Sequence, residues 1–245
     1  MRVHCVSTGV VRGKRARRGP RRYLPGGWSD RTLPVNVFAI EHHDGLCVFD
    51  TGQTARAARR GYLPRWHPFL RLARFELTEA DEAATQLART GLDIASTRWV
   101  VLSHLHTDHA GCVGAFAGAD VLVSAIEWRR ATGPRGRLRG YLTQHWPREI
   151  EPTLVRPSPP AVGPFAGSYD VAGDGTLLLV PTPGHTPGHL SLLVDTGERS
   201  FLLAGDLVHD AAELASVAPA VAGWCAENGV VVLAAHDPAA RERLT

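Results

Sequence analysis

The stretch "SHLHTDHAG", residues 103–111, places three histidines and an aspartate within six positions, namely His104, His106, Asp108 and His109. It follows "TRWVVL" (97–102), whose apolar run has the length of a buried strand. Side chains alternate along an extended segment, so His104, His106 and Asp108 are expected on one side. A helix that begins after Asp108 would bring His109 round to them. The stretch therefore predicts a strand that ends in a cluster of metal ligands.

Imidazole and carboxylate groups are ligands for zinc, and also for iron or manganese. Gathering so many of them without a cation would cost desolvation free energy with no compensation. Two tetrahedral ions need more ligands than this cluster provides, so further ligands are expected downstream. The candidates follow later apolar runs, at strand ends where α/β sheets collect ligands: His185 in "PTPGHTPGH", Asp206 in "LLAGDLVH" and His236 in "VVLAAHDP".

The rest of the chain alternates between strand and helix patterns, which indicates a layered α/β fold and one domain over residues 1–245. Asp44 and Gly45 lie between two strand-like runs and predict a type I′ hairpin turn. Strands are expected at 3–11, 35–40, 119–125, 175–184, 189–206 and 228–237. Helices are expected at 78–91, 126–132 and 211–227, and 131–168 is expected to be irregular with a short helix near 141–146.

Composition and charge exclude several classes of protein. No apolar stretch reaches the roughly 18 residues that a membrane span needs, and an arginine-rich segment stands where a signal peptide is apolar, so a cytoplasmic location is expected. The four cysteines are scattered and are expected to be buried thiols. Cys112 is the one possible exception, because it is close to the histidines.

The net charge of +3 is unevenly distributed. The segment 12–22 could attract an anionic substrate or a phosphate backbone, or it could be a solvated loop. The rest of the chain is net acidic, so a nucleic-acid partner is not expected. Seven of the 27 basic residues lie in this segment: Arg12, Lys14, Arg15, Arg17, Arg18, Arg21 and Arg22.

The order of the motifs resembles the metallo-β-lactamase superfamily over residues 35–237. The motifs are "FDTG" at 49–52, H-x-H-x-D-H at 104–109, "GHTPGH" at 184–189, a strand ending at Asp206 and a strand ending at His236. This resemblance implies a four-layer αββα sandwich with the site along one edge of the two sheets. It also implies two metal ions, taken as Zn²⁺ with iron, manganese or cobalt as alternatives. One ion would be held by His104, His106 and His185, the other by Asp108, His109 and His236, with Asp206 bridging.

Two cations that share a bridging water lower the pKa of that water towards neutrality. The resemblance therefore implies a hydrolase in which a bridging hydroxide attacks a carbonyl, and Asp108 is the candidate to pass a proton to the leaving group. Within the superfamily the chain is most similar to the N-acyl homoserine lactone lactonases. The expected substrate is a small lactone or ester, with no membrane partner, and a homodimer is left open.

One position departs from those lactonases, which place a tyrosine three residues after the bridging aspartate. Here the residue is His209, a second candidate catalytic residue, whose ring can donate a hydrogen bond with a different reach. The segment 61–78 resembles their covering loop, and Trp66, Phe69 and Phe75 are either a wall for an acyl chain or core. Tyr23 and Trp28 lie in a basic, Gly- and Pro-rich segment, 12–34, expected to be a loop or lid.

Several alternatives stay open at this point. A glyoxalase-type thioesterase would use the same metals on a thioester, and a persulfide dioxygenase-like enzyme would use one iron. A scaffold that keeps metal only for stability is disfavoured, because structural zinc sites are closed by four ligands. Among the other histidines, His189 is expected to be structural or to orient a ligand, and His42 and His43 are expected to be exposed.

Overall fold

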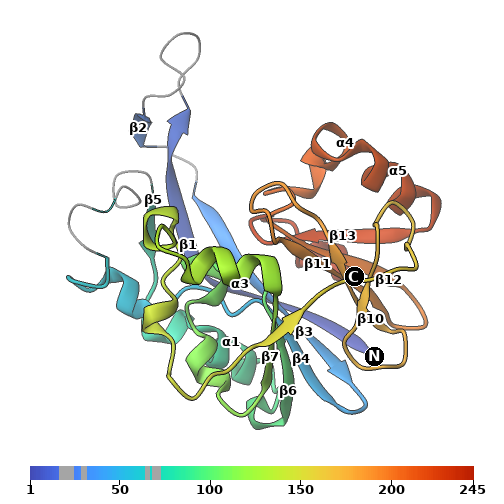
Figure 1. The fold of residues 1–245 in the computed structure, drawn as a ribbon, viewed down its shortest axis with the longest axis horizontal. Coiled ribbons are helices and arrows are strands. Elements are labelled where there is room, and N and C mark those ends of the chain that lie inside the picture. The colour runs from blue at the N-terminus through green and yellow to red at the C-terminus, as the bar shows by residue number, and fades with distance from the viewer. Residues whose placement is uncertain (17–24, 29–31, 64–66, 68–72) are drawn as a thin grey trace.

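Two β-sheets pack face to face in the computed structural model, which describes residues 1–16, 25–28, 32–63, 67 and 73–245 (Figure 1). The first sheet has eight strands in the order β2-β1-β3-β4-β6-β7-β8, with β5 paired to β1. They are β1 (Arg2–Ala16), β2 (Pro25–Trp28), β3 (Leu33–His42), β4 (Gly45–Phe49), β5 (Ala73–Glu76), β6 (Thr97–Val101), β7 (Asp120–Ser124) and β8 (Thr153–Val155). The second sheet has five strands in the order β13-β12-β11-β10-β9. They are β9 (Tyr169–Asp170), β10 (Leu177–Pro181), β11 (Leu190–Asp195), β12 (Ser200–Gly205) and β13 (Val230–Ala234).

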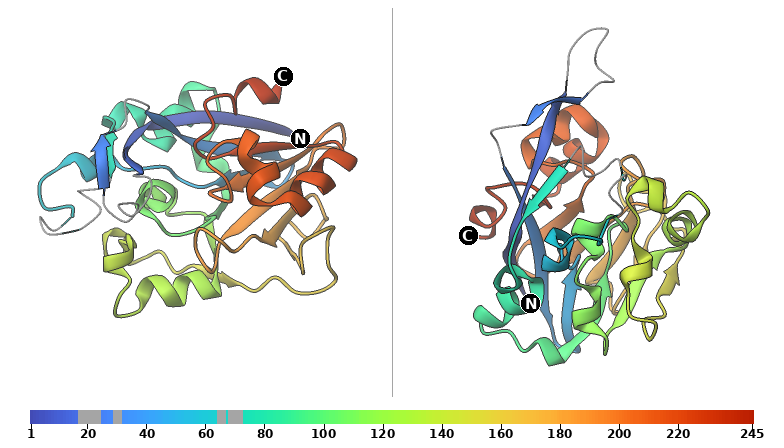
Figure 2. Two further views of the ribbon diagram at one scale, coloured as in Figure 1. Left: turned by 90° about the horizontal axis from the view of Figure 1, so that it is seen from above. Right: turned by 90° about the vertical axis from the view of Figure 1, so that its left-hand side faces the viewer.

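Helices cover the outer face of each sheet (Figures 1 and 2). Inward residues such as Phe38, Phe49 and Leu203 form the core between the sheets, while Val37 belongs to a second core cluster, together with Leu87 of α1. Because both faces of these strands are buried, their sequences read as continuous apolar runs. The four-layer αββα arrangement is therefore confirmed. The helices are α1 (Ala83–Arg89), α2 (Thr107–Ala110), α3 (Ala125–Thr132), α4 (Leu214–Val217) and α5 (Pro219–Glu227).

Two predicted helices are shorter than expected, each for a local reason. At 78–91, a 3₁₀ turn over Glu79–Asp81 comes first and Glu82 is extended, because its carboxylate accepts from Thr54 Oγ1 and the Ala55 N–H, both at 2.8 Å. At 211–227, α4 and α5 are separate helices, since Pro219 lacks an N–H and begins a new one.

The predicted hairpin at Asp44 is confirmed, but the predicted turn type is wrong. His42 pairs with Gly45, so the two turn residues are His43 and Asp44. A type I′ turn needs positive φ at both. Among the described residues other than glycine, only Asp50 has positive φ, and in this hairpin the positive φ belongs to Gly45, at 135°.

The segment 12–34 is not simply the predicted loop. β1 continues to Ala16 and pairs with β2 through Lys14 and Trp28, and this end of the first sheet projects beyond its other strands (Figure 1). The predictions for Arg17, Arg18, Arg21, Arg22, Tyr23, Trp66 and Phe69 lie outside the described residues. Within the described ranges, no helix combines the length and apolarity needed to cross a membrane.

Candidate metal centre

The histidine-rich stretch joins β6 to α2, and the helix begins earlier than predicted. His106 is the N-cap of α2 and Thr107 its first residue, so Asp108 already lies inside the helical turn. As a result Asp108 does not share a face with His104 and His106. Metal-capable atoms instead gather in two main groups, the three-histidine group of His104, His106 and His185, and the mixed group of Asp108, His109 and His236.

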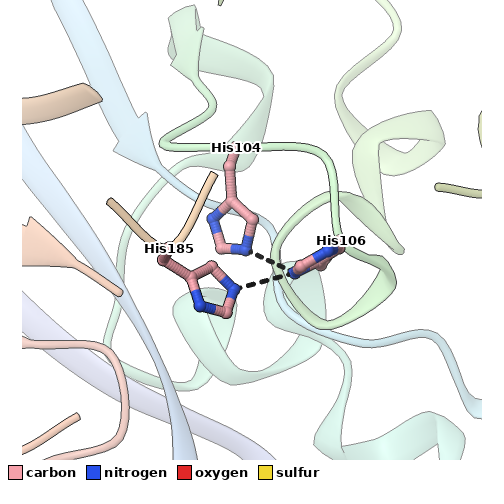
Figure 3. A group of neighbouring side chains, drawn as sticks. All are labelled: His104, His106 and His185. Atoms are coloured by element: carbon pink, nitrogen blue, oxygen red, sulfur yellow. Dashed lines mark hydrogen bonds between the residues drawn. The ribbon is translucent and has the colours of Figure 1, made fainter. Parts of the chain in front are cut away.

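The three-histidine group brings its nitrogens almost into contact (Figure 3). His106 Nδ1 lies 3.0 Å from His104 Nε2 and 2.9 Å from His185 Nε2. His185 comes from the loop between β10 and β11, 79 positions further along the chain than His106. The order of the strands, and not proximity in sequence, therefore assembles this group.

Asp206, at the end of β12, lies between the two groups. Its Oδ2 is 3.4 Å from His185 Nε2, and its Oδ1 is 3.4 Å from both His109 Nε2 and His236 Nε2. In the mixed group His236 Nε2 is 3.8 Å from Asp108 Oδ2. The structure thus brings together all seven residues that the sequence singled out.

The protons of two ring nitrogens in the three-histidine group are fixed by outward hydrogen bonds. His106 Nε2 faces the Arg139 carbonyl at 3.1 Å, which can only accept, so the proton is on Nε2. The Ser103 hydroxyl donates to Asp50 Oδ2 at 2.9 Å and so accepts from His104 Nδ1 at 3.0 Å. In both rings the inward nitrogen therefore carries a lone pair.

In the mixed group, too, outward hydrogen bonds fix the ring protons. His109 Nδ1 donates to Asp50 Oδ2 at 2.8 Å, and His236 Nδ1 donates to the Pro34 carbonyl at 2.7 Å. In the neutral rings the inward nitrogens carry lone pairs too. His109 Nε2 and Asp206 Oδ1 are buried with no hydrogen-bond partner among the described residues. Buried polar atoms are rarely left unpaired. Four inward lone pairs beside two carboxylates are a donor set that suits divalent cations.

The pKa values of the three-histidine group agree with this donor set. Burial lowers the pKa of His104 and His106, and lowers that of His185 to about 4, so these rings are neutral at pH 7. Burial also opposes the charged forms of His109 and Asp206. The surrounding carboxylates nevertheless raise the pKa of His109, and His109 and His236 lower that of Asp206.

Asp50 is the main residue of the site whose role the sequence did not reveal, although it lies within "FDTG". It holds both parts of the histidine stretch, because it accepts from the Ser103 N–H, the Ser103 hydroxyl and His109 Nδ1. Its φ of 61° is left-handed, a conformation that costs about 1 kcal/mol and that aspartate tolerates better than most residues. The backbone is thus strained where it orients two rings.

His189 orients Asp206, as one of its two predicted roles requires. Its Nε2 accepts from the Asp206 backbone N–H at 3.0 Å, and its Nδ1 lies 2.8 Å from Thr182 Oγ1. Burial lowers the pKa of this ring to about 3, so Nε2 keeps its lone pair. Gly205 makes the approach possible, because a Cβ there would lie 2.7 Å from His189 Nε2 and its φ is 55°.

His209 lies at the exposed mouth of the centre. Its ring centroid is 5.6 Å from that of His236 and 6.4 Å from that of His185. Phe75 on β5 is half-buried. The four cysteines are free and buried, as predicted. The Cys112 thiol donates to the Gln53 carbonyl at 3.3 Å, and among the described residues it belongs to none of the groups of metal-capable atoms.

His42 is buried, which contradicts the expectation that it is exposed, whereas His43 is exposed. The Asp44 N–H donates to His42 Nδ1 at 3.1 Å, so the proton is on Nε2 and points at Asp174 Oδ2, 2.9 Å away. His42, His43 and Asp174 form another group of metal-capable atoms. Because both nitrogens of His42 are already used, this histidine has no free lone pair for a cation.

Removing the metal should lower the melting temperature of the protein. Zinc at about 100 times its Kd stabilises a native state by ~2.7 kcal/mol. For 245 residues this corresponds to a shift of about 5–10 °C. Differential scanning calorimetry before and after dialysis against a chelator measures the shift, and re-addition of Zn²⁺ is the control. An unchanged melting temperature would contradict a centre that binds metal.

Comparisons with known proteins agree with this architecture. Residues 30–236 match the model of the metallo-beta-lactamase superfamily. An N-acyl homoserine lactonase, AttM, from Rhizobium radiobacter is 34% identical over 69% of this chain and 62% of its own length. An N-acyl homoserine lactonase from Bacillus cereus is 30% identical over 70% of this chain and 62% of its own. The chain thus spans less than two thirds of these relatives.

Solved structures show the same fold. An N-acyl homoserine lactone hydrolase, with the product N-hexanoyl-L-homoserine bound at its catalytic metal centre, superposes with a TM-score of 0.76 and 22% identity, covering 96% of this chain and 93% of that one. AidC, a dizinc quorum-quenching lactonase, gives a TM-score of 0.65 with 17% identity over 96% and 87%. With the family model matched over most of its length, this chain belongs to the metallo-β-lactamase superfamily.

Proposed function

We propose that this protein is a hydrolase that opens a lactone with the help of two divalent cations, Zn²⁺ in the first place. The observation that carries the proposal is the convergence of inward lone pairs from four histidines on the carboxylates of Asp206 and Asp108. The names of the relatives, N-acyl homoserine lactonases, support the same reaction. An N-acyl homoserine lactone is the substrate that we test first.

The proposed ligands are seven residues, namely the six of the two groups and Asp206. When bound, such a pair of cations makes a shared water acidic enough to act as a nucleophile and withdraws charge from the attacked carbonyl. The groups that surround the centre orient the histidine rings. Asp50, Ser103 and the carbonyls of Pro34 and Arg139 keep the ring protons of four of the five histidines on the outer side.

Asp108 is the proposed proton carrier. Its side chain is 13% exposed, against 5% for Asp206, so it is the carboxylate of the centre that an incoming substrate meets. In the reaction the nucleophilic oxygen bonds to the carbonyl carbon and the ring C–O bond breaks. Asp108 accepts the proton of the nucleophile and delivers it to the departing alkoxide, which leaves a hydroxy acid.

His209 is proposed to contact the substrate carbonyl from the mouth of the site. Replacing it with tyrosine, as in the lactonases that the sequence resembles, should raise kcat/KM for an acyl homoserine lactone by about five-fold. This is the worth of one neutral hydrogen bond in the transition state. A matched His209→Phe variant has the ring but no hydroxyl and should not show the gain. Equal kcat/KM in wild type and both variants would discard a substrate contact at this position.

A hydrolysis panel tests the proposed function. Zinc-loaded protein is offered lactones, aryl esters, thioesters and a β-lactam, and acid release is followed with a pH indicator. Turnover of lactones above the other classes is expected, with about two zinc ions per chain by elemental analysis. Preference for thioesters would favour the glyoxalase-type reaction, and one iron with oxygen uptake would favour a dioxygenase. A cytoplasmic location, a homodimer and a single domain stay predictions from the sequence.

A further inference from the structure

Glu127 on α3 is a fully buried carboxylate outside the seven-residue centre. Its Oε1 accepts from the Leu105 backbone N–H at 3.2 Å, whereas its Oε2 has no hydrogen-bond partner among the described residues. Leu105 stands between His104 and His106. The hydrogen bond of Glu127 therefore holds the peptide that joins two members of the three-histidine group.

Tyr141 links Glu127 to the same group by a second route. Its ring stacks on that of His106, with centroids 5.2 Å apart and planes 25° apart, and the two backbones form an antiparallel bridge. The Tyr141 hydroxyl lies near Glu127 and Arg130, and burial together with the negative charge of Glu127 raises the pKa of the phenol. Glu127 thus supports His106 through both Leu105 and Tyr141.

The loop that supplies His185 packs on the same turn of α3. A Cβ at Gly188 would lie 2.4 Å from the backbone nitrogen of Glu127 and 2.7 Å from its Cα, so only glycine allows this approach. Ser124 caps the helix, since its hydroxyl accepts from the N–H groups of Ile126 and Glu127. The first turn of α3 is therefore fixed against both segments that carry the three-histidine group.

The mixed group is held by different residues. His109 donates to Asp50, and His236 donates to the Pro34 carbonyl. Stabilisation of the core does not explain Glu127, because burying a carboxylate oxygen without a partner is unfavourable. Its bonds lead to one half of the centre only.

We propose that Glu127 is a positioning residue for the three-histidine half of the centre. Through Leu105 and Tyr141 it fixes the directions of the His104 and His106 lone pairs, and so it sets the affinity of one cation and not of the other. The inference rests on the two-cation centre proposed above and adds to it a residue that touches neither cation nor substrate.

The test titrates metal-free protein with Zn²⁺ against a chromogenic chelator, so it needs no substrate. Wild type is expected to show two dissociation constants. In Glu127→Leu one of them should rise by about 10- to 100-fold, as for other residues that orient ligands, while the other stays within about two-fold. Glu127→Gln keeps an oxygen for the Leu105 N–H and should restore the wild-type values. Glu127→Asp, which withdraws the carboxylate by one methylene, should raise the same single dissociation constant. It replaces Glu127→Leu as the test if that variant does not fold.

Adding Glu127→Leu to two further variants identifies which half of the metal centre it affects. In His236→Ala the remaining affinity should fall when Glu127→Leu is added, whereas in His185→Ala the addition should change little. Thr132→Ala is the matched control, because it alters the far end of α3, where the Thr132 hydroxyl donates to the Trp128 carbonyl at 2.9 Å, and it should leave both constants unchanged. The inference is overturned if Glu127→Leu changes both constants equally or neither, or if Thr132→Ala reproduces its effect. A wild-type protein that binds no zinc would overturn the proposed function instead.

Discussion

Asp108→Asn is expected to lower kcat for an alkyl lactone by about 10²- to 10⁴-fold, the usual contribution of a general acid–base group. Asparagine has nearly the same size and keeps one oxygen towards His236, but it cannot take up a proton from the nucleophile or deliver one to the alkoxide. Asp108 is also a proposed ligand, so metal content must be measured in the same samples. Steady-state kinetics at saturating Zn²⁺ give the result.

Comparing substrates with different leaving groups separates the loss of proton transfer in Asp108→Asn from a loss of metal. An aryl ester releases a phenolate, which needs protonation far less than an alkoxide does, so Asp108→Asn should impair the aryl ester much less than the lactone. Asp195→Asn is a matched control, because Asp195 ends β11 and its carboxylate, among the described residues, accepts only from the nearby Gly197 N–H. Equal losses for both substrates would rule out Asp108 as the proton carrier.

Asp206→Asn is expected to lower the metal content from about two ions per chain to about one or fewer, and activity by more than about 100-fold. Residues that merely orient ligands already cost 10- to 100-fold, and Asp206 faces both groups directly. Its Oδ1 is 3.4 Å from His109 Nε2 and from His236 Nε2, and its Oδ2 is 3.4 Å from His185 Nε2. The amide removes the negative charge between two proposed cations.

Elemental analysis after gel filtration measures this loss, and a melting curve of the metal-free variant shows that it is folded. His43→Asn is a suitable control, because it alters an exposed histidine of the metal-capable group at the β3–β4 hairpin. It should keep the full metal content. An Asp206→Asn protein that retains two tightly bound ions would show that this carboxylate does not bridge.

The proposed ligands can be picked out from the sequence because they follow the ends of apolar strands, and strand ends can be predicted from the local pattern. The predicted start of α2, after Asp108, is two residues late, since the ψ of 153° at His106 depends on the tertiary surroundings. The two halves of the centre were therefore assigned by resemblance and not by alternation along a strand. The strand pattern alone would have grouped Asp108 with His104.

Residues that orient the ligands were harder to predict, because their partners are distant in sequence. Asp50 is 53 positions from Ser103 and 59 from His109, and His42 is buried against Asp174, 132 positions away. Glu127 reads as an ordinary helix residue, because its partner Leu105 is 22 positions earlier on another element. Such pairings can be predicted only when the order of the strands in the sheets is known.

The central claim is that two cations are shared by one set of seven side chains. A crystal structure of metal-replete protein, with anomalous data at the zinc edge, tests it most directly. We expect two anomalous peaks, one on His104, His106 and His185 and the other on Asp108, His109 and His236, with Asp206 contacting both. A single peak, or Asp206 and His236 turned away from the other ligands, would contradict the account.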